Sequence, residues 1–133
     1  MTKSNLDKVF KSSQNFEKEG IWLEVSSGVS FLIRRFGGYN ASKVKASLAK
    51  HYKPYARLIE NGSLPEAKET EIMTRVFVES SMVDWKGIEI DGKDTPFSVD
   101  AAIQLLTSLP DLSDTLLAYA SDSKNYREDL GNS

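Results

Sequence analysis

The chain has 133 residues, of which 40% are hydrophobic and 27% are charged, and its formal net charge is −2. This length and composition are typical of a single globular domain with one core. The slight acidity argues against a dedicated nucleic-acid binder, and the lack of cysteine excludes disulfides and thiolate metal sites. We expect no signal peptide and no membrane span, because the N-terminus and the apolar runs are too polar or too short.

The N-terminal third is predicted to contain a polar segment and then a β-hairpin. Residues 1–19 are rich in lysine and carry only a broken apolar stripe, which fits either a flexible arm or a short helix. In residues 20–37, apolar and polar residues alternate on both sides of Gly28. This alternation predicts two strands joined by a loop of three residues, with Gly28 in the left-handed conformation.

The register of this hairpin decides which residues share a face. If Val25 lies opposite Val29, the second face carries Trp22 opposite Leu32. That second face is either covered by the N-terminal arm or exposed as an apolar patch, and exposed patches often mark a binding site. The first face, predicted to pack on helices, would hold Ile21, Leu23, Val25, Val29, Phe31 and Ile33.

Helical periodicity dominates the rest of the chain. One helix is predicted over about 41–60, with a kink or a break at Pro54. Another is predicted from Pro65 to about residue 83, and shorter helices follow Ser98 and Pro110. The apolar stripe of the first helix consists of Val44, Leu48, Tyr52, Tyr55 and Ile59.

Residues 84–98 separate the two helical blocks. Asp91 and Gly92 favour a tight turn, because both can adopt a positive φ. Ser98 can cap the next helix by accepting a hydrogen bond from a backbone N–H in its first turn. Trp85 is then placed to be the core residue over which the flanking helices close.

These elements predict an α+β fold that is mostly helical, with an N-terminal β-hairpin packed on a bundle of about four helices. The globular domain is expected to extend over residues 20–127, and residues 128–133 are expected to be a frayed tail. The fraying is predicted to begin near Tyr126, where the sequence becomes polar.

No catalytic, cofactor-binding or metal-binding residue is predicted. His51 is the only histidine and has no nucleophile or orienting group beside it in the sequence. The acidic loop around Gly92 does not fit a calcium-binding EF-hand, since Gly87 and Ser98 stand where carboxylates are required. A basic and aromatic helix could hold phosphates or could be a solvated face, and its cations are Lys43, Lys45, Lys50, Lys53 and Arg57.

Several short segments, taken together, resemble those of a known family through their order and spacing over residues 20–127. The family is that of the tail assembly chaperones of bacteriophages with long, non-contractile tails. The segments are Gly20–Val25, Phe31–Arg35, Lys53–Tyr55, Asp84–Gly87, Pro96–Ser98, Leu105–Leu106 and Leu109–Leu112.

The resemblance implies a non-enzymatic protein of the host cytoplasm that is absent from the mature virion. Members of this family bind and solubilise the tape measure protein and help to recruit tail tube subunits. Self-association and a longer, frameshifted form are left open, and the family has no catalytic residues to transfer. The residues that we expect to contact helices of a partner are Trp22, Leu32, Tyr52 and Tyr55.

A second interpretation uses the basic helix at 41–60. It makes the chain a small phage DNA-associated protein or a head or tail completion protein. The two interpretations differ in one simple observation, because only the second predicts DNA binding that weakens steeply with salt.

Overall fold

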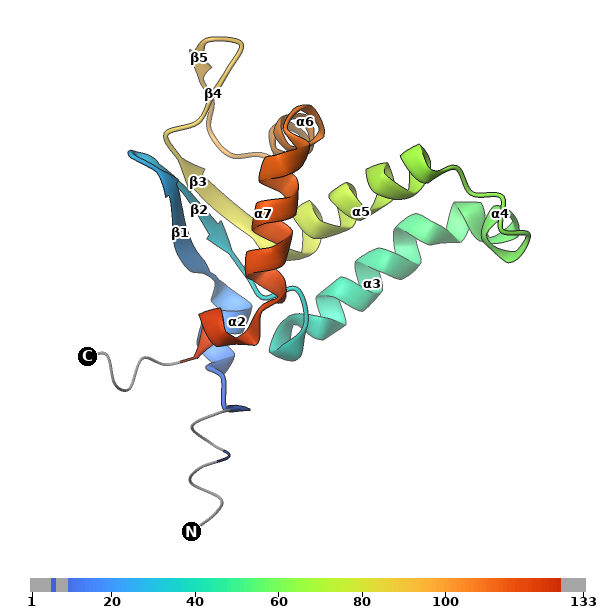
Figure 1. Cartoon of the computed structure of the whole chain (residues 1–133), viewed down its shortest axis with the longest axis horizontal. Coiled ribbons are helices and arrows are strands. Elements are labelled where there is room, and N and C mark those ends of the chain that lie inside the picture. Colours follow the sequence, from blue (N-terminus) through green and yellow to red (C-terminus); the bar gives the residue numbers. More distant parts are fainter. Residues whose placement is uncertain (1–5, 7–9, 128–133) are drawn as a thin grey trace.

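The computed structural model describes residues 6 and 10–127 of the chain (Figure 1). The described part is an α+β fold that is mostly helical, with a three-stranded antiparallel sheet in the order β1-β2-β3. This confirms the predicted class of an N-terminal hairpin packed on a small set of helices. Within that part, no helix is both long enough and apolar enough to cross a bilayer.

The helices and strands follow one another in a simple order. They are α2 (Gln14–Glu19), β1 (Ile21–Ser26), β2 (Val29–Ile33), η1 (Gly38–Asn40), α3 (Ala41–Tyr52), η2 (Lys53–Tyr55), α4 (Ala56–Glu60), α5 (Glu66–Ser81), β3 (Met82–Lys86), β4 (Glu89–Ile90), β5 (Lys93–Asp94), α6 (Val99–Ser108), α7 (Pro110–Ser121) and η3 (Ser123–Tyr126).

The β1–β2 hairpin confirms one prediction of register and corrects another. Trp22 lies opposite Leu32, as expected. At the turn end, however, Ser26 and not Val25 lies opposite Val29, because the pairing shifts between residues 24 and 26. A bulge of this kind leaves one residue unpaired and turns its side chain away from the regular face. Val25 is therefore 37% exposed and does not join the packed face.

A third strand stands where the sequence predicted the end of a helix. The helix α5 ends at Ser81, and β3 then pairs with β2 so that Trp85 lies opposite Phe31. The backbone of Met82 is extended, with φ −88° and ψ 134°. Residues 82–86 are extended because they pair with the free edge of β2. The sequence did not predict this strand, since five residues are too few to show a clear alternation of apolar and polar side chains.

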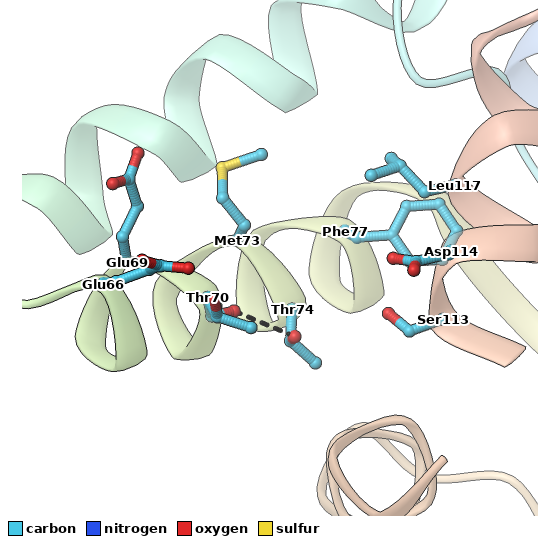
Figure 2. A pocket seen from close by; sticks show the side chains of 9 residues that line it. All are labelled: Glu66, Glu69, Thr70, Met73, Thr74, Phe77, Ser113, Asp114 and Leu117. Atoms are coloured by element: carbon cyan, nitrogen blue, oxygen red, sulfur yellow. Dashed lines mark hydrogen bonds between the residues drawn. The ribbon is translucent and has the colours of Figure 1, made fainter. Parts of the chain in front are cut away.

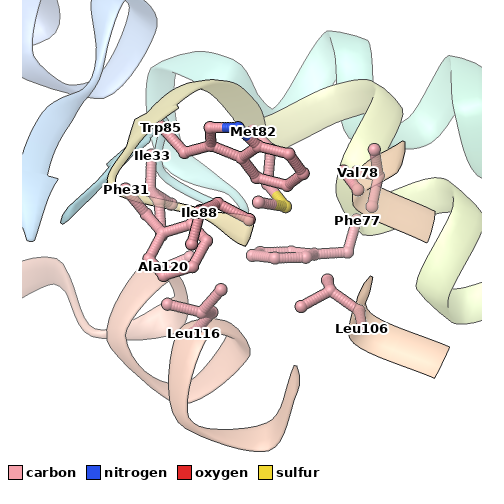
Figure 3. Packing of buried hydrophobic residues seen from close by; sticks show 11 residues of the cluster. Phe31, Ile33, Phe77, Val78, Met82, Trp85, Ile88, Leu106, Leu116 and Ala120 are labelled. Atoms are coloured by element: carbon pink, nitrogen blue, oxygen red, sulfur yellow. The ribbon is translucent and has the colours of Figure 1, made fainter. Parts of the chain in front are cut away.

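Trp85 is buried as a member of the core cluster, which confirms that it is a core residue (Figure 3). Its ring meets Phe31 edge-on at 6.2 Å and Phe97 edge-on at 5.2 Å between centroids. Its indole Nε1 donates a hydrogen bond of 2.8 Å to the carbonyl oxygen of Thr95. Around it, the core is formed by Phe31, Ile33, Phe77, Val78, Met82, Ile88, Ala102, Leu106, Leu116 and Ala120.

The connection from β3 to α6 has the predicted turn and the predicted cap. Asp91 and Gly92 both have positive φ, 54° and 76°, and they join the short strands β4 and β5. The Ser98 hydroxyl accepts a hydrogen bond of 3.0 Å from the backbone N–H of Ala101, in the first turn of α6. Local sequence therefore determines how the chain enters this helix.

The helices α3 and α5 form a long hairpin that extends away from the sheet, with α4 near its tip (Figure 1). The predicted break at Pro54 is confirmed, because α3 ends at Tyr52 and a single 3-10 turn separates it from α4. The His51 imidazole, in the last turn of α3, lies 2.8 Å from a carboxylate oxygen of Glu79 on α5. The contact links the two helices of the hairpin.

The N-terminal helix α2 is held by a buried carboxylate. Glu17 has no exposed surface and accepts hydrogen bonds from the backbone N–H of Tyr39, at 2.7 Å, and from the Arg35 guanidinium, at 3.0 Å. A side chain at Gly38 would overlap the Glu17 carboxylate, so the close approach requires glycine there. The helix α2 falls within residues 1–19, for which an arm and a short helix were both compatible with the sequence.

Tyr126 corrects the prediction of fraying near the C-terminus. It is fully buried, and its hydroxyl donates a hydrogen bond of 3.2 Å to the carbonyl oxygen of Ile33. Its ring meets that of Tyr119 edge-on, and burial raises the pKa of the Tyr126 hydroxyl. The sequence did not predict this contact, because Tyr126 and Ile33 are 93 residues apart in the chain. The tail at 128–133 lies outside the described residues.

Replacement of Trp85 by alanine should destabilise the fold strongly. We expect Trp85→Ala to lower the free energy of unfolding by about 3–5 kcal/mol, because the surrounding side chains cannot refill the space. Trp22→Ala is the matched control, since Trp22 is 39% exposed, and its replacement should cost about 1 kcal/mol or less. Urea denaturation followed by circular dichroism measures both. Equal losses in the two variants would contradict the placement of Trp85.

The charge of Glu79 should make stability depend on pH. Burial alone would raise the pKa of Glu79, but the hydrogen bond from His51 and the positive charges of His51, Lys50 and Arg75 outweigh it, so the pKa is lowered. A lowered pKa stabilises the fold fully above the ordinary carboxyl value of 4.5, and this contribution is lost as pH falls through the lower folded value.

Glu79→Gln should therefore lower the free energy of unfolding by about 1 kcal/mol at pH 7, and the difference from wild type should shrink below about pH 4. Glu71→Gln is the control, because Glu71 belongs to the same helix but is exposed and pairs only with Lys68. Denaturant titrations from acid to neutral pH provide the measurement. A difference for Glu79→Gln that stays constant down to pH 2.5 would show that its carboxylate charge does not stabilise the fold.

Candidate functional site

The outward face of the sheet carries an apolar patch formed by Trp22 and Leu32. Trp22 is 39% exposed, and Leu32, directly opposite on β2, is half-buried. The Lys86 ammonium lies 4.2 Å from the centroid of the Trp22 ring, a distance that favours a cation–π interaction. We call these two apolar residues the Trp22–Leu32 patch. It faces away from the core, because the alternate residues Phe31 and Ile33 are fully buried.

Part of this patch is covered from the side of α2. A Cβ atom at Gly20 would lie 3.1 Å from the Leu32 side chain, so the backbone there is in close contact with it. In the preceding segment, Leu6 and Phe10 are 59% and 70% exposed, so neither is buried against the sheet. Among the described residues, Trp22 is thus the main apolar surface that this face offers to a partner.

Tyr52 and Tyr55, the other two predicted contact residues, lie on a separate surface. They stand at the end of α3 and in the turn before α4, at the end of the helical hairpin that is remote from β1 (Figure 1). Both are half-buried, and the Lys68 ammonium lies 5.4 Å from the centroid of the Tyr55 ring. Burial and, to a lesser extent, the negative charge of Glu69 raise the pKa of Tyr52. The four predicted residues therefore form two surfaces and not one.

The contact between His51 and Glu79 links helix α3 to helix α5. Ser47, one turn before His51, is 3.5 Å from the same Glu79 oxygen. A nucleophilic serine would need to meet the imidazole, but this hydroxyl meets the carboxylate instead. In the part of the chain that the structure describes, no three His, Cys, Asp or Glu side chains gather where they could hold a metal ion.

The basic residues of α3, η2 and α4 are largely exposed to solvent. Lys43, Lys45, Lys53 and Arg57 are exposed, and Lys50 lies 3.8 Å from Glu79 while its side chain remains 70% exposed. Lys43 and Lys50 are seven residues apart and so lie on the same side of α3. The interpretation as a solvated face and the interpretation as a phosphate-binding face both fit this exposure.

Sequence reasoning missed a groove between α5 and α7, which has a volume of about 290 Å³. Its apolar floor consists of Met73 and Phe77 from α5 and Leu117 from α7 (Figure 2). Its remaining lining is polar or acidic and consists of Glu66, Glu69, Thr70, Thr74, Ser113 and Asp114. The sequence shows each helix with its apolar stripe, but it does not show that these two helices lie side by side.

Comparison with protein families adds an assignment to this geometry. The family model described as "YdaY prophage protein" matches residues 39–131, which are 93 of the 133 residues. The matched segment begins after the β1–β2 hairpin and includes every element from α3 to α7. Searches among curated proteins and among solved structures found no match. This phage-associated chain therefore belongs to the YdaY prophage protein family.

Proposed function

We propose that this phage protein is a tail assembly chaperone. In the host cytoplasm it binds the tape measure protein, keeps it soluble and helps to recruit tail tube subunits, and it catalyses no reaction. The protein then leaves the assembly and is not part of the mature virion. Membership of a prophage protein family supports the phage setting. The observation that carries the proposal is the Trp22–Leu32 patch on the outward face of the sheet.

The patch has the physical properties that a chaperone of helical clients needs. A client with apolar helical faces is kept soluble by binders that offer small apolar surfaces, because large surfaces would make the binders themselves aggregate. A tryptophan supplies much contact area and loses little conformational freedom on binding. The neighbouring charges of Lys86, Glu24 and Asp84 keep the free face solvated, so that contact with the client is reversible.

Tyr52 and Tyr55 add a second contact surface at the other end of the molecule. Two surfaces on one protein allow it to contact a long client at two points, or to contact the client and a tube subunit together. Linked contacts of this kind raise the overall affinity without requiring either one to be strong.

Replacement of Trp22 by glutamate should abolish the capture of the tape measure protein. We expect Trp22→Glu to reduce the amount recovered in co-purification more than about tenfold, because a tryptophan at the centre of an interface contributes about 2 kcal/mol or more. Val99→Glu is the matched control, since Val99 is also 39% exposed but lies on α6. Circular dichroism verifies that both variants are folded. Undiminished recovery with folded Trp22→Glu would refute a role for the patch.

The exposed cations of α3 and α4 favour a second candidate function. A small DNA-associated protein, or a head or tail completion protein, would use this helix to contact phosphates, with Tyr52 and Tyr55 as stacking groups. The net charge of −2 opposes long-range attraction to DNA, so we rank this function second.

Gel retardation with a DNA fragment separates the two functions. The chaperone function predicts no retardation at physiological salt. The DNA-associated function predicts retardation that falls steeply between about 50 and 200 mM salt. It also predicts that Lys43→Glu with Lys53→Glu abolishes the shift, whereas Lys11→Glu with Lys18→Glu, a change of equal charge outside the helix, does not. Such a pattern would replace the proposed function by the second one.

A further inference from the structure

We propose that the groove between α5 and α7 binds an amphipathic helix of another protein, one whose apolar stripe is bordered by lysine or arginine. We call this groove the acidic groove. The inference concerns a different surface from the Trp22–Leu32 patch. It holds whether or not the partner is the tape measure protein, so the two proposals can fail separately.

The floor of the acidic groove offers apolar surface that the fold itself leaves partly open. Met73 and Leu117 are half-buried, and Phe77 lies beneath them at 2% exposure. In Figure 2 the side chains of Phe77 and Leu117 lie together, with Met73 farther along α5. The volume of about 290 Å³ is at the lower end of ligand pockets and is enough for a few aliphatic side chains from one helix face.

The charges of the groove select the partner. Glu66 and Glu69 border it near the start of α5, and Asp114 borders it on α7 (Figure 2). No lysine, arginine or histidine belongs to its lining. The ion pairs among the described residues involve other carboxylates, those of Glu17, Glu71 and Glu79. An incoming cation would therefore meet carboxylates that are exposed and not already paired within this part of the chain.

The shape of the groove selects a helix as the occupant. Glu66 and Phe77 are eleven residues apart on one helix, a distance of about 16 Å, or about three turns of a partner helix. Helices α5 and α7 form its two sides, and an amphipathic helix that enters such a groove places apolar residues at i, i+4 and i+7 on the floor. Acidic residues at both ends of an apolar floor match a helix with cations flanking its stripe. A nucleic acid is disfavoured, because its phosphates would face three carboxylates.

The test is a titration of the full-length protein with designed peptides. The first is a peptide of about 14 residues with leucines at i, i+4 and i+7 and lysines near both ends, and the second has glutamates in place of the lysines. We expect the first to bind by calorimetry at low salt and the second not to bind. Chemical-shift changes in amide spectra should fall on α5 and α7.

Charge reversal in the groove should remove this binding. Glu66→Lys with Glu69→Lys should weaken binding of the lysine peptide about tenfold or more, and added salt should weaken the wild-type interaction. Glu71→Lys is the matched control, because Glu71 lies on the same helix, is 54% exposed and is not part of the lining. Met73→Asp tests the apolar floor separately and should also weaken binding.

Two results would overturn the inference. One is equal binding of the lysine and glutamate peptides, or an equal loss in the Glu71→Lys control, because either would show that the groove charges do not select the partner. The other is self-association of the protein that is lost in Glu66→Lys with Glu69→Lys. Sedimentation would detect it, and it would assign the groove to a second copy of this chain instead of a partner helix.

Discussion

The burial of Trp85 is the interaction on which the rest of the fold depends. Trp85 lies on β3, opposite Phe31 of β2, so its position requires that the third strand has joined the hairpin. Its indole N–H is satisfied by the carbonyl oxygen of Thr95, and its ring packs against Phe97 just before α6. The contacts of this one side chain thus join the sheet, the β4–β5 hairpin and the start of α6. A two-stranded hairpin without this addition would be marginally stable in water.

Buried polar groups hold the periphery to this core. Glu17 ties α2 to the segment after β2, and Asn40 donates hydrogen bonds to the carbonyl oxygens of Arg35 and Ser80 at 2.9 and 3.0 Å. Tyr126 closes the other end of the chain onto β2 through Ile33. Each of these contacts satisfies a polar group that would be costly to bury alone. They leave the helical hairpin of α3 and α5 as the element that extends away from the body (Figure 1).

The arrangement of the body and of the α3–α5 hairpin determines which surfaces are exposed. The sheet packs one face on the core, and its other face, partly covered beside α2, shows the Trp22–Leu32 patch. The helical hairpin leaves a groove where α5 lies next to α7, and it carries exposed cations on α3. The family match includes the groove and the cations but not the patch, because it begins at residue 39. Of the two surfaces proposed to bind partners, the family match therefore includes only the groove.

Local chemistry was sufficient for part of this picture. The alternation around Gly28 predicted the β1–β2 hairpin, and the Asp91–Gly92 pair predicted the turn between β4 and β5. Ser98 predicted a helix start and Pro54 a break, since each acts through the backbone of its immediate neighbours. Only the tertiary structure decided that Met82–Lys86 is a strand, that Tyr126 is buried, that His51 meets Glu79 and that α5 and α7 enclose a groove. These features depend on contacts between residues far apart in the chain, and periodicity within a segment carries no information about which segment will lie beside it.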